Sequence, residues 1–137
     1  MKIAFCASMA FAKEMIEIKN KLEQKGHTII LPHNTEKYAS GKWDAESKSE
    51  SVENKKKYDL INKYFEVIKN SDAILIINHK KNNIPNYIGG NGLIEIAFAH
   101  VLGKKIFLLN PIPEISYSDE IKAMSPIVLN GRLEEIK

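Results

Sequence analysis

Residues 72–78, DAILIIN, indicate the fold class of the chain. The five residues between Asp72 and Asn78 are all apolar and form the most hydrophobic run in the chain. A continuous apolar run of this length, rich in isoleucine, is typical of a strand that is buried on both faces. Such strands occupy the interior of parallel sheets, so DAILIIN is predicted to be the central strand of a parallel sheet.

On either side of this run, shorter apolar segments predict four more strands: KIAFCA (2–7), HTIIL (27–31), KIFLLN (105–110) and IVL (127–129). Apolar residues at helical spacing predict helices between them, beginning near Phe11, Tyr58, Leu93 and residue 118. Strands that alternate with helices predict an α/β fold, with about five parallel strands covered by helices on both faces. The length fits a single domain over residues 1–137.

The predicted topology indicates where a ligand binds. In open parallel sheets, ligands lie outside the carboxyl ends of the strands, at the point where the strand order reverses. This rule selects the loops at 7–12, from Pro32 onward, at 78–92 and at 110–117. Residues 33–50 are polar, contain Trp43 and are predicted to form one long loop.

Composition excludes several classes of protein. The net charge of +3 comes from 19 lysines and one arginine, and the lysines are scattered among acids. This pattern favours a solvated surface over a nucleic-acid interface. No apolar run reaches the roughly 20 residues of a membrane span, and no segment resembles a signal peptide, so a cytoplasmic location is expected. The four histidines and Cys6 lack metal-ligand spacing, so no metal site is predicted.

The segment YIGGNGLIE (87–95) is the most informative candidate site. Glycines at 89, 90 and 92 allow the backbone to approach a ligand closely. Glu95 is expected in the first turn of the following helix, where its carboxylate stays ionised and is able to act as a nucleophile. Its alternative role is that of an acid that favours a helix N-terminus. The segment also resembles the glycine-rich fingerprint of dinucleotide-binding proteins. It does not follow the first strand, however, and Glu95 takes the place of the third glycine, so this match is rejected.

Two further polar residues follow predicted strands. Ser8 comes after the first strand, where it is able to bind a phosphate or to cap the next helix. His79 comes after the central strand, where it contacts a ligand or faces solvent. For both residues, the sequence alone leaves the two roles open.

Four segments together resemble the nucleoside 2-deoxyribosyltransferase superfamily, including its 2-deoxynucleoside 5′-monophosphate N-hydrolase branch. They are FCASM (5–9), NSDAILIIN (70–78), G-x-x-x-x-IEIAFAHVLGKKIFLL (89–109) and KAMSP (122–126). The resemblance implies a flavodoxin-like, three-layer, doubly wound sheet. It also implies that Glu95 attacks C1′ of the sugar of a nucleoside or nucleotide and forms a glycosyl-enzyme intermediate, without a metal or organic cofactor. The enzymes assemble as homodimers or higher homo-oligomers in which a neighbouring subunit completes each site.

The resemblance also implies a set of site residues. Glu95 and Tyr64 are the expected catalytic residues. Lys122 is expected to cross the subunit interface and reach the 5′ end of the sugar. The expected substrate-binding residues are Cys6, Ser8, Met9, His79, Tyr87, Gly89, Gly90, Asn91, Gly92 and Lys122.

Three positions depart from the family pattern. The family has a tyrosine in the first strand that touches the nucleophile, and this chain has Ala4 there. The family has an aspartate that assists the departing base, and this chain has Tyr64. The family has an aspartate or serine six residues before the glutamate, and this chain has Gly89. Candidate substitutes for the missing partners are Tyr64, Tyr87, Asn91 and His79, because a phenol or an imidazole is able to hydrogen-bond to a base or a carboxylate. Protonation of the departing base is left to Tyr64, a loop residue or solvent. The alternative function is a nucleotide-binding or sensing module on the same fold, without chemistry.

Overall fold

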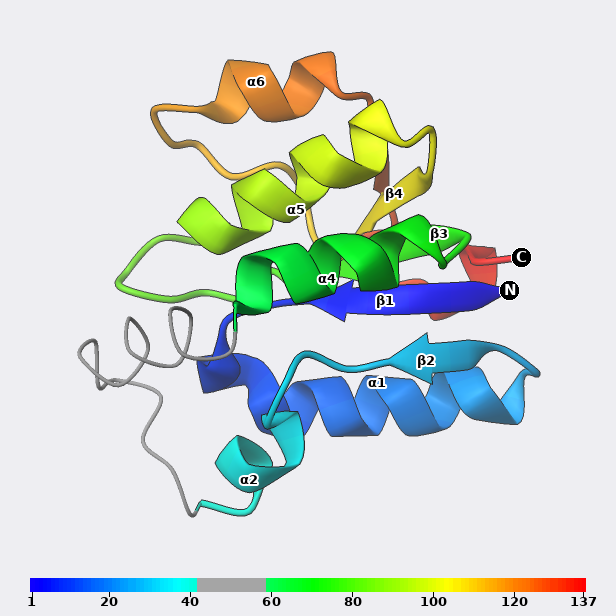
Figure 1. The fold of residues 1–137 in the computed structure, drawn as a ribbon. Helices are drawn as coiled ribbons and strands as arrows, with labels where there is room; N and C mark the ends of the chain where they lie inside the picture. The colour runs from blue at the N-terminus through cyan, green and yellow to red at the C-terminus, as the bar shows by residue number, and fades with distance from the viewer. Residues whose placement is uncertain (42–58) are drawn as a thin grey trace.

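The computed structural model describes residues 1–41 and 59–137, and its centre is a parallel sheet (Figure 1). Five strands pair in the order β2-β1-β3-β4-β5. Their bounds are β1 Lys2–Cys6, β2 Thr28–Ile30, β3 Ala73–Ile76, β4 Lys105–Leu108 and β5 Ile127–Val128. All five strands predicted from the sequence are confirmed, and DAILIIN supplies the central one. This strand order is that of a flavodoxin-like, doubly wound sheet, with its switch point between β1 and β3.

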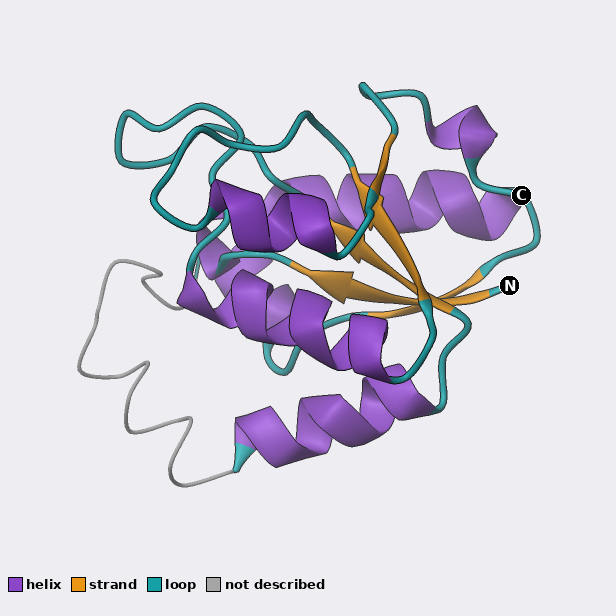
Figure 2. Cartoon of the chain, turned by 90° about the horizontal axis from the view of Figure 1, so that it is seen from above, coloured by secondary structure: helices purple, strands orange, loops and turns teal. Residues whose placement is uncertain are grey.

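Helices cover both faces of the sheet, which gives three layers (Figure 2). The helix α1 (Ala12–Gln24) packs on one face, together with the short helix η2 (Leu133–Glu135). The helices α4 (Leu60–Lys69), α5 (Gly90–Val101) and α6 (Ser118–Ala123) pack on the other. The remaining short helices are η1 (Met9–Phe11), after β1, and α2 (Thr35–Ala39), after β2.

The alternation of side chains along β1 divides the core into two clusters. Ile3 and Phe5 belong to the cluster beneath α1, whereas Ala4 and Cys6 belong to the cluster beneath α4 and α5. Successive side chains of a strand point to opposite faces, so residues two apart share a face. Cys6 therefore lies at the end of β1 on the face that α4 and α5 cover.

The structure corrects the predicted loop over residues 33–50. The helix α2 forms within it, and its first residue, Thr35, is buried and donates a hydrogen bond to the carbonyl oxygen of Pro32 at 2.7 Å. The prediction failed because this turn of helix has too few apolar residues to show a periodic pattern. Trp43 and Tyr58 lie outside the described residues.

The structure also corrects the expected position of Glu95. The helix α5 begins at Gly90, which places Glu95 in the second turn rather than the first. The stabilisation of an anion by a helix N-terminus falls off within the first turn. The helix end is therefore a minor influence on Glu95, whose surroundings come from the neighbouring strands and helices.

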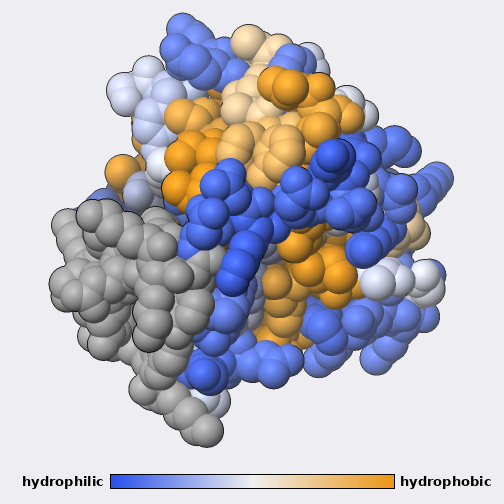
Figure 3. Space-filling view, viewed as in Figure 1, coloured by the Kyte–Doolittle hydropathy of each residue, from blue (hydrophilic) through white to orange (hydrophobic). Residues whose placement is uncertain are grey.

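The surface over α5 is partly apolar, as the space-filling view in Figure 3 shows. Ile94 is 39% exposed and Val101 is 81% exposed, and both belong to this helix. Within residues 1–41 and 59–137, no helix is long and apolar enough to cross a membrane.

Candidate active site

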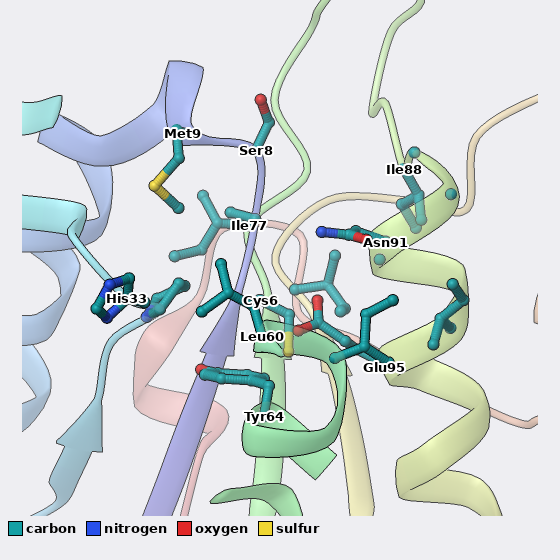
Figure 4. Close-up of a pocket in the computed structure, with 18 of the residues that line it drawn as sticks. Cys6, Ser8, Met9, His33, Leu60, Tyr64, Ile77, Ile88, Asn91 and Glu95 are labelled. Carbon is teal, nitrogen blue, oxygen red and sulfur yellow. The ribbon is translucent and has the colours of Figure 1, made fainter. Parts of the chain in front are cut away.

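A cavity of about 530 Å³ opens at the carboxyl ends of β1 and β3, the switch point of the sheet (Figure 4). Three of the four loops that the topology rule selected contribute residues to its walls. Among the described lining residues, none comes from the fourth loop, 110–117. That loop is held elsewhere, because the buried side-chain amide of Asn78 donates to the carbonyl oxygens of Asn110 and Pro111 at 3.0 and 3.1 Å.

Most of the site residues expected from the sequence meet in this cavity. Ten of them line it: Cys6, Ser8, Met9, Tyr64, Tyr87, Gly89, Gly90, Asn91, Gly92 and Glu95. The other two lie outside it. The ring of His79 packs edge-on against Phe11, with 5.4 Å between the ring centroids, and Lys122 is exposed on α6.

Glu95 reaches from α5 into the cavity and meets Cys6 at the end of β1 (Figure 4). The thiol of Cys6 is fully buried and lies beside the Glu95 carboxylate, to which it is able to donate a hydrogen bond. Burial raises the pKa of this thiol well above its usual value, and the charge of Glu95 raises it further. The strand-one contact to Glu95 thus comes from Cys6, two residues beyond Ala4 and on the same face of β1.

Tyr64, on α4, lies beside this pair, but its hydroxyl is engaged by the backbone. The phenol donates to the carbonyl oxygen of Phe5, and the carbonyl oxygen of Ile30 lies 3.4 Å away. Burial raises the pKa of the Tyr64 phenol well above its usual value, with smaller contributions from Cys6 and Glu95. In this arrangement the phenol is a poor proton donor to a departing base, which was its expected role.

Ser8 and Lys81 meet at another part of the cavity wall. The ammonium group of Lys81 donates to the hydroxyl oxygen of Ser8 at 2.7 Å and lies 5.6 Å from the ring centroid of Tyr87. The Ser8 oxygen also accepts a hydrogen bond from the backbone N–H of Ala10 at 3.2 Å. The predicted capping role of Ser8 is therefore confirmed, and the structure adds a cation beside it.

The glycines before Glu95 serve partly to let neighbouring side chains pack. A Cβ at Gly89 would lie 3.0 Å from the hydroxyl of Tyr87, and one at Gly92 would lie 3.0 Å from the Cγ2 of Ile88. A Cβ at Gly90 would meet nothing within 4 Å. Close approach of the backbone to a ligand is thus open at Gly90, whereas a side chain at Gly89 or Gly92 would press against Tyr87 or Ile88.

Sequence reasoning missed several polar residues of the cavity. His33 follows β2, Lys63 belongs to α4, and Lys81 lies in the loop after β3. Two of them, His33 and Lys81, fall in loops that the topology rule had selected. The rule identifies loops, but it does not distinguish a histidine or lysine that faces the cavity from one that faces solvent.

Glu95 is the one carboxylate among the described residues that line the cavity. Elsewhere in the described part of the chain, no three His, Cys, Asp or Glu side chains lie close enough together to hold a metal ion. Comparisons with models of known protein families, with curated proteins and with solved structures find no match to the chain.

Proposed function

We propose that the protein cleaves or transfers the N-glycosidic bond of a nucleoside or nucleoside 5′-monophosphate, through a glycosyl-enzyme intermediate on Glu95. The observation that carries this proposal is the position of the Glu95 carboxylate. It lies in a cavity at the switch point of a doubly wound sheet, where such folds bind their ligands. The resemblance of residues 94–109 to the deoxyribosyltransferase superfamily supports the same assignment.

In the proposed reaction, a carboxylate oxygen of Glu95 attacks C1′ of the sugar. The bond between C1′ and the base nitrogen breaks, and the base leaves with the bonding electrons and takes up a proton. Water, or the nitrogen of a second base, then attacks C1′ and releases Glu95 as a carboxylate, with loss of one proton from the incoming nucleophile. Both steps pass through a positively charged, oxocarbenium-like sugar, which a nearby negative charge stabilises.

The geometry of this displacement indicates where the base lies. Attack by Glu95 drives the base toward the opposite side of C1′. The wall opposite Glu95 contains Met9 and His33 (Figure 4). The thioether of Met9 suits the flat face of a base, and an imidazole is able to act as a general acid toward a departing base. We therefore propose His33 as the group that protonates the departing base.

Lys81 and Ser8 support a substrate with a 5′-phosphate. An ammonium group and a hydroxyl, 2.7 Å apart, offer a charge and a hydrogen bond to an anion. The first N–H groups of α5, around Gly90 and Asn91, have no acceptor within the helix and line the same cavity. The expected contact from Lys122 of a neighbouring subunit would come in addition to these groups.

One observation favours a second function, that of a sensor which binds a nucleotide without chemistry. Glycosidases normally divide their work between two carboxylates. Among the described lining residues Glu95 has no second carboxylate beside it, and the hydroxyl of Tyr64 is engaged by the backbone. Binding is expected under both functions, whereas release of base is expected only under the first.

The test is to incubate the protein with a panel of nucleosides and 5′-monophosphates, ribo and deoxy, and to measure free base by chromatography. Wild-type protein is expected to release base, and Glu95→Gln is expected to lose this activity by more than roughly 1,000-fold. Glutamine keeps the shape of the side chain and removes the nucleophile. Glu17→Gln, an exposed substitution on α1, is the matched control and should behave like wild type.

Two readouts separate the enzyme from the sensor. A sugar adduct on Glu95, seen by mass spectrometry after rapid quenching, would establish the intermediate. Binding of a nucleotide, seen as a rise in melting temperature, without release of base even when an acceptor base is present, would establish the sensor and refute the enzyme.

A further inference from the structure

We propose that Cys6 is a positioning residue, whose thiol donates a hydrogen bond that holds the Glu95 carboxylate in the orientation needed for attack on C1′. This inference rests on the proposed function and adds a residue for which the sequence suggested only substrate contact. It assigns the one cysteine of the chain to the nucleophile rather than to the substrate.

The contact joins two rigid elements of the fold. Cys6 is the last residue of β1, whose backbone pairs with β2 on one side and β3 on the other. Glu95 lies in the second turn of α5, whose buried residues Ile96 and Ala99 belong to the same core cluster as Cys6. The Cys6 thiol is therefore fixed by the central sheet, and the longer and more flexible side chain of Glu95 extends to it from α5 (Figure 4).

The chemistry of the thiol suits this role. Tyr64 also lies close to the pair, but it donates its hydrogen bond to the carbonyl oxygen of Phe5. The thiol is fully buried and stays protonated at neutral pH, so it offers Glu95 a neutral donor and no competing negative charge. The thiol also makes a long hydrogen bond, 4.0 Å, to the carbonyl oxygen of Ala4, which competes with Glu95 for its proton.

A thiol donor has a consequence for the nucleophile. An S–H group is a weaker donor than a hydroxyl, so it orients a carboxylate while withdrawing less of its electron density. A hydroxyl at the same place would also orient Glu95. An apolar side chain of similar size would leave the Glu95 carboxylate without this hydrogen-bond donor. These differences define the variants that test the role.

The contact itself is measurable without any activity, by infrared spectroscopy of the S–H stretch. The band belongs to Cys6 alone, because the chain has a single cysteine. A hydrogen bond to a carboxylate lowers the stretching frequency, so Glu95→Gln should move the band to higher frequency. Glu17→Gln, a distant exposed substitution, should leave it in place. A band that is identical in wild type and Glu95→Gln would overturn the proposed contact.

Kinetics then test what the contact does. Cys6→Val removes the donor at similar volume and is expected to lower kcat roughly 10-fold with little change in KM, on the usual strength of a hydrogen bond to a charged group. Cys6→Ser restores a donor and should recover most of that loss. Ile74→Val, in the same core cluster but outside the lining of the cavity, controls for looser packing and should keep the wild-type kcat.

The outcomes separate the two proposals. Absence of base release from wild-type protein would overturn the proposed function, and the positioning role with it, whatever the infrared band shows. If wild type releases base, equal kcat values for wild type and Cys6→Val would overturn the role of Cys6 alone. A loss in Cys6→Ser as large as that in Cys6→Val would also overturn it, because packing would then explain both variants.

Discussion

The ammonium group of Lys81 donates a hydrogen bond to the hydroxyl oxygen of Ser8 at 2.7 Å, and so joins the loop after β3 to the loop after β1. A tight turn fixes Lys81 in place. Lys81 and Ile84 exchange backbone hydrogen bonds of 3.1 and 2.9 Å, and Asn82 and Asn83 between them have positive φ angles. Such a pair of asparagines matches the turn that a two-residue hairpin needs. The cation is thus held at the cavity by local structure.

The first prediction concerns this cation. Lys81→Met keeps the aliphatic stem and removes the charge. We expect it to raise the Kd for a nucleoside 5′-monophosphate roughly 10- to 100-fold, as for the loss of a charge-assisted hydrogen bond, with little change for the nucleoside. Lys80→Met, an exposed neighbour outside the cavity lining, is the control. Calorimetric titration measures both ligands, and an equal loss for nucleoside and monophosphate would mean that Lys81 does not contact the phosphate.

The second prediction compares two histidines. His33 lines the cavity opposite Glu95, whereas the ring of His79 packs against Phe11. We expect His33→Gln to slow base release by roughly 100-fold, the usual contribution of a general acid, and His79→Gln to leave the rate nearly unchanged. Initial rates measured by chromatography decide between them. A larger loss in His79→Gln than in His33→Gln would overturn the assignment of His33 as the proton donor.

The sequence predicted the sheet well, because its strands carry their signal in consecutive residues. The apolar run of DAILIIN is unbroken, and β3 is the central strand, with every residue buried. Short or polar elements carry no such signal. The helix α2 has five residues and one buried side chain, so it was predicted as loop. The start of α5 was misplaced, because Gly90 and Gly92 are atypical of a helix interior.

The candidate site was predictable only in part, because a cavity is made of contacts that are distant in the sequence. The glycine-bearing segment before Glu95 is local, and it was found. The partner of Glu95 is Cys6, 89 positions earlier, and only the parallel pairing of β1 with β3 and the packing of α5 bring the two together. Lys81 and Ser8 are likewise 73 residues apart. Sequence periodicity specifies which face a residue occupies and leaves its partner undetermined.

The third prediction concerns pH and stability. The folded state raises the pKa of the Cys6 thiol well above its ordinary value of 9.0. Above that pH the unfolded chain releases the thiol proton and the folded chain keeps it, so the unfolded state binds fewer protons and stability falls as pH rises. The loss from this group is about 1.4 kcal/mol for each pH unit above the unfolded pKa.

Cys6→Ser removes this titration and retains Tyr64, whose raised pKa affects both proteins at high pH. We expect the free energy of unfolding of wild-type protein to decline faster than that of Cys6→Ser above pH 9.0. Below that pH, the difference between them should be constant. Urea unfolding at a series of pH values measures both, and parallel pH curves for the two proteins would contradict the raised pKa.

The fourth prediction concerns assembly. Lys122 is exposed on α6 and outside the cavity of its own chain, so any role in the site has to be played in a neighbouring subunit. The apolar surface over α5 supports such an assembly, because Val101 is 81% exposed and exposed apolar patches are typical of interaction surfaces (Figure 3). Light scattering should give a mass of at least twice 15.5 kDa at micromolar concentration.

Complementation tests the shared site directly. A Glu95→Ala protein lacks the nucleophile, and a Lys122→Ala protein lacks the residue expected to cross the interface, so we expect each alone to be impaired. In a mixed dimer, one site combines Glu95 from one chain with Lys122 from the other and is complete. Mixing the two variants under conditions that exchange subunits should therefore restore base release. Wild-type activity in Lys122→Ala alone would show that the phosphate is bound within one chain, by Lys81 and Ser8. The activity of the mixture would then be no greater than the summed activities of the two variants.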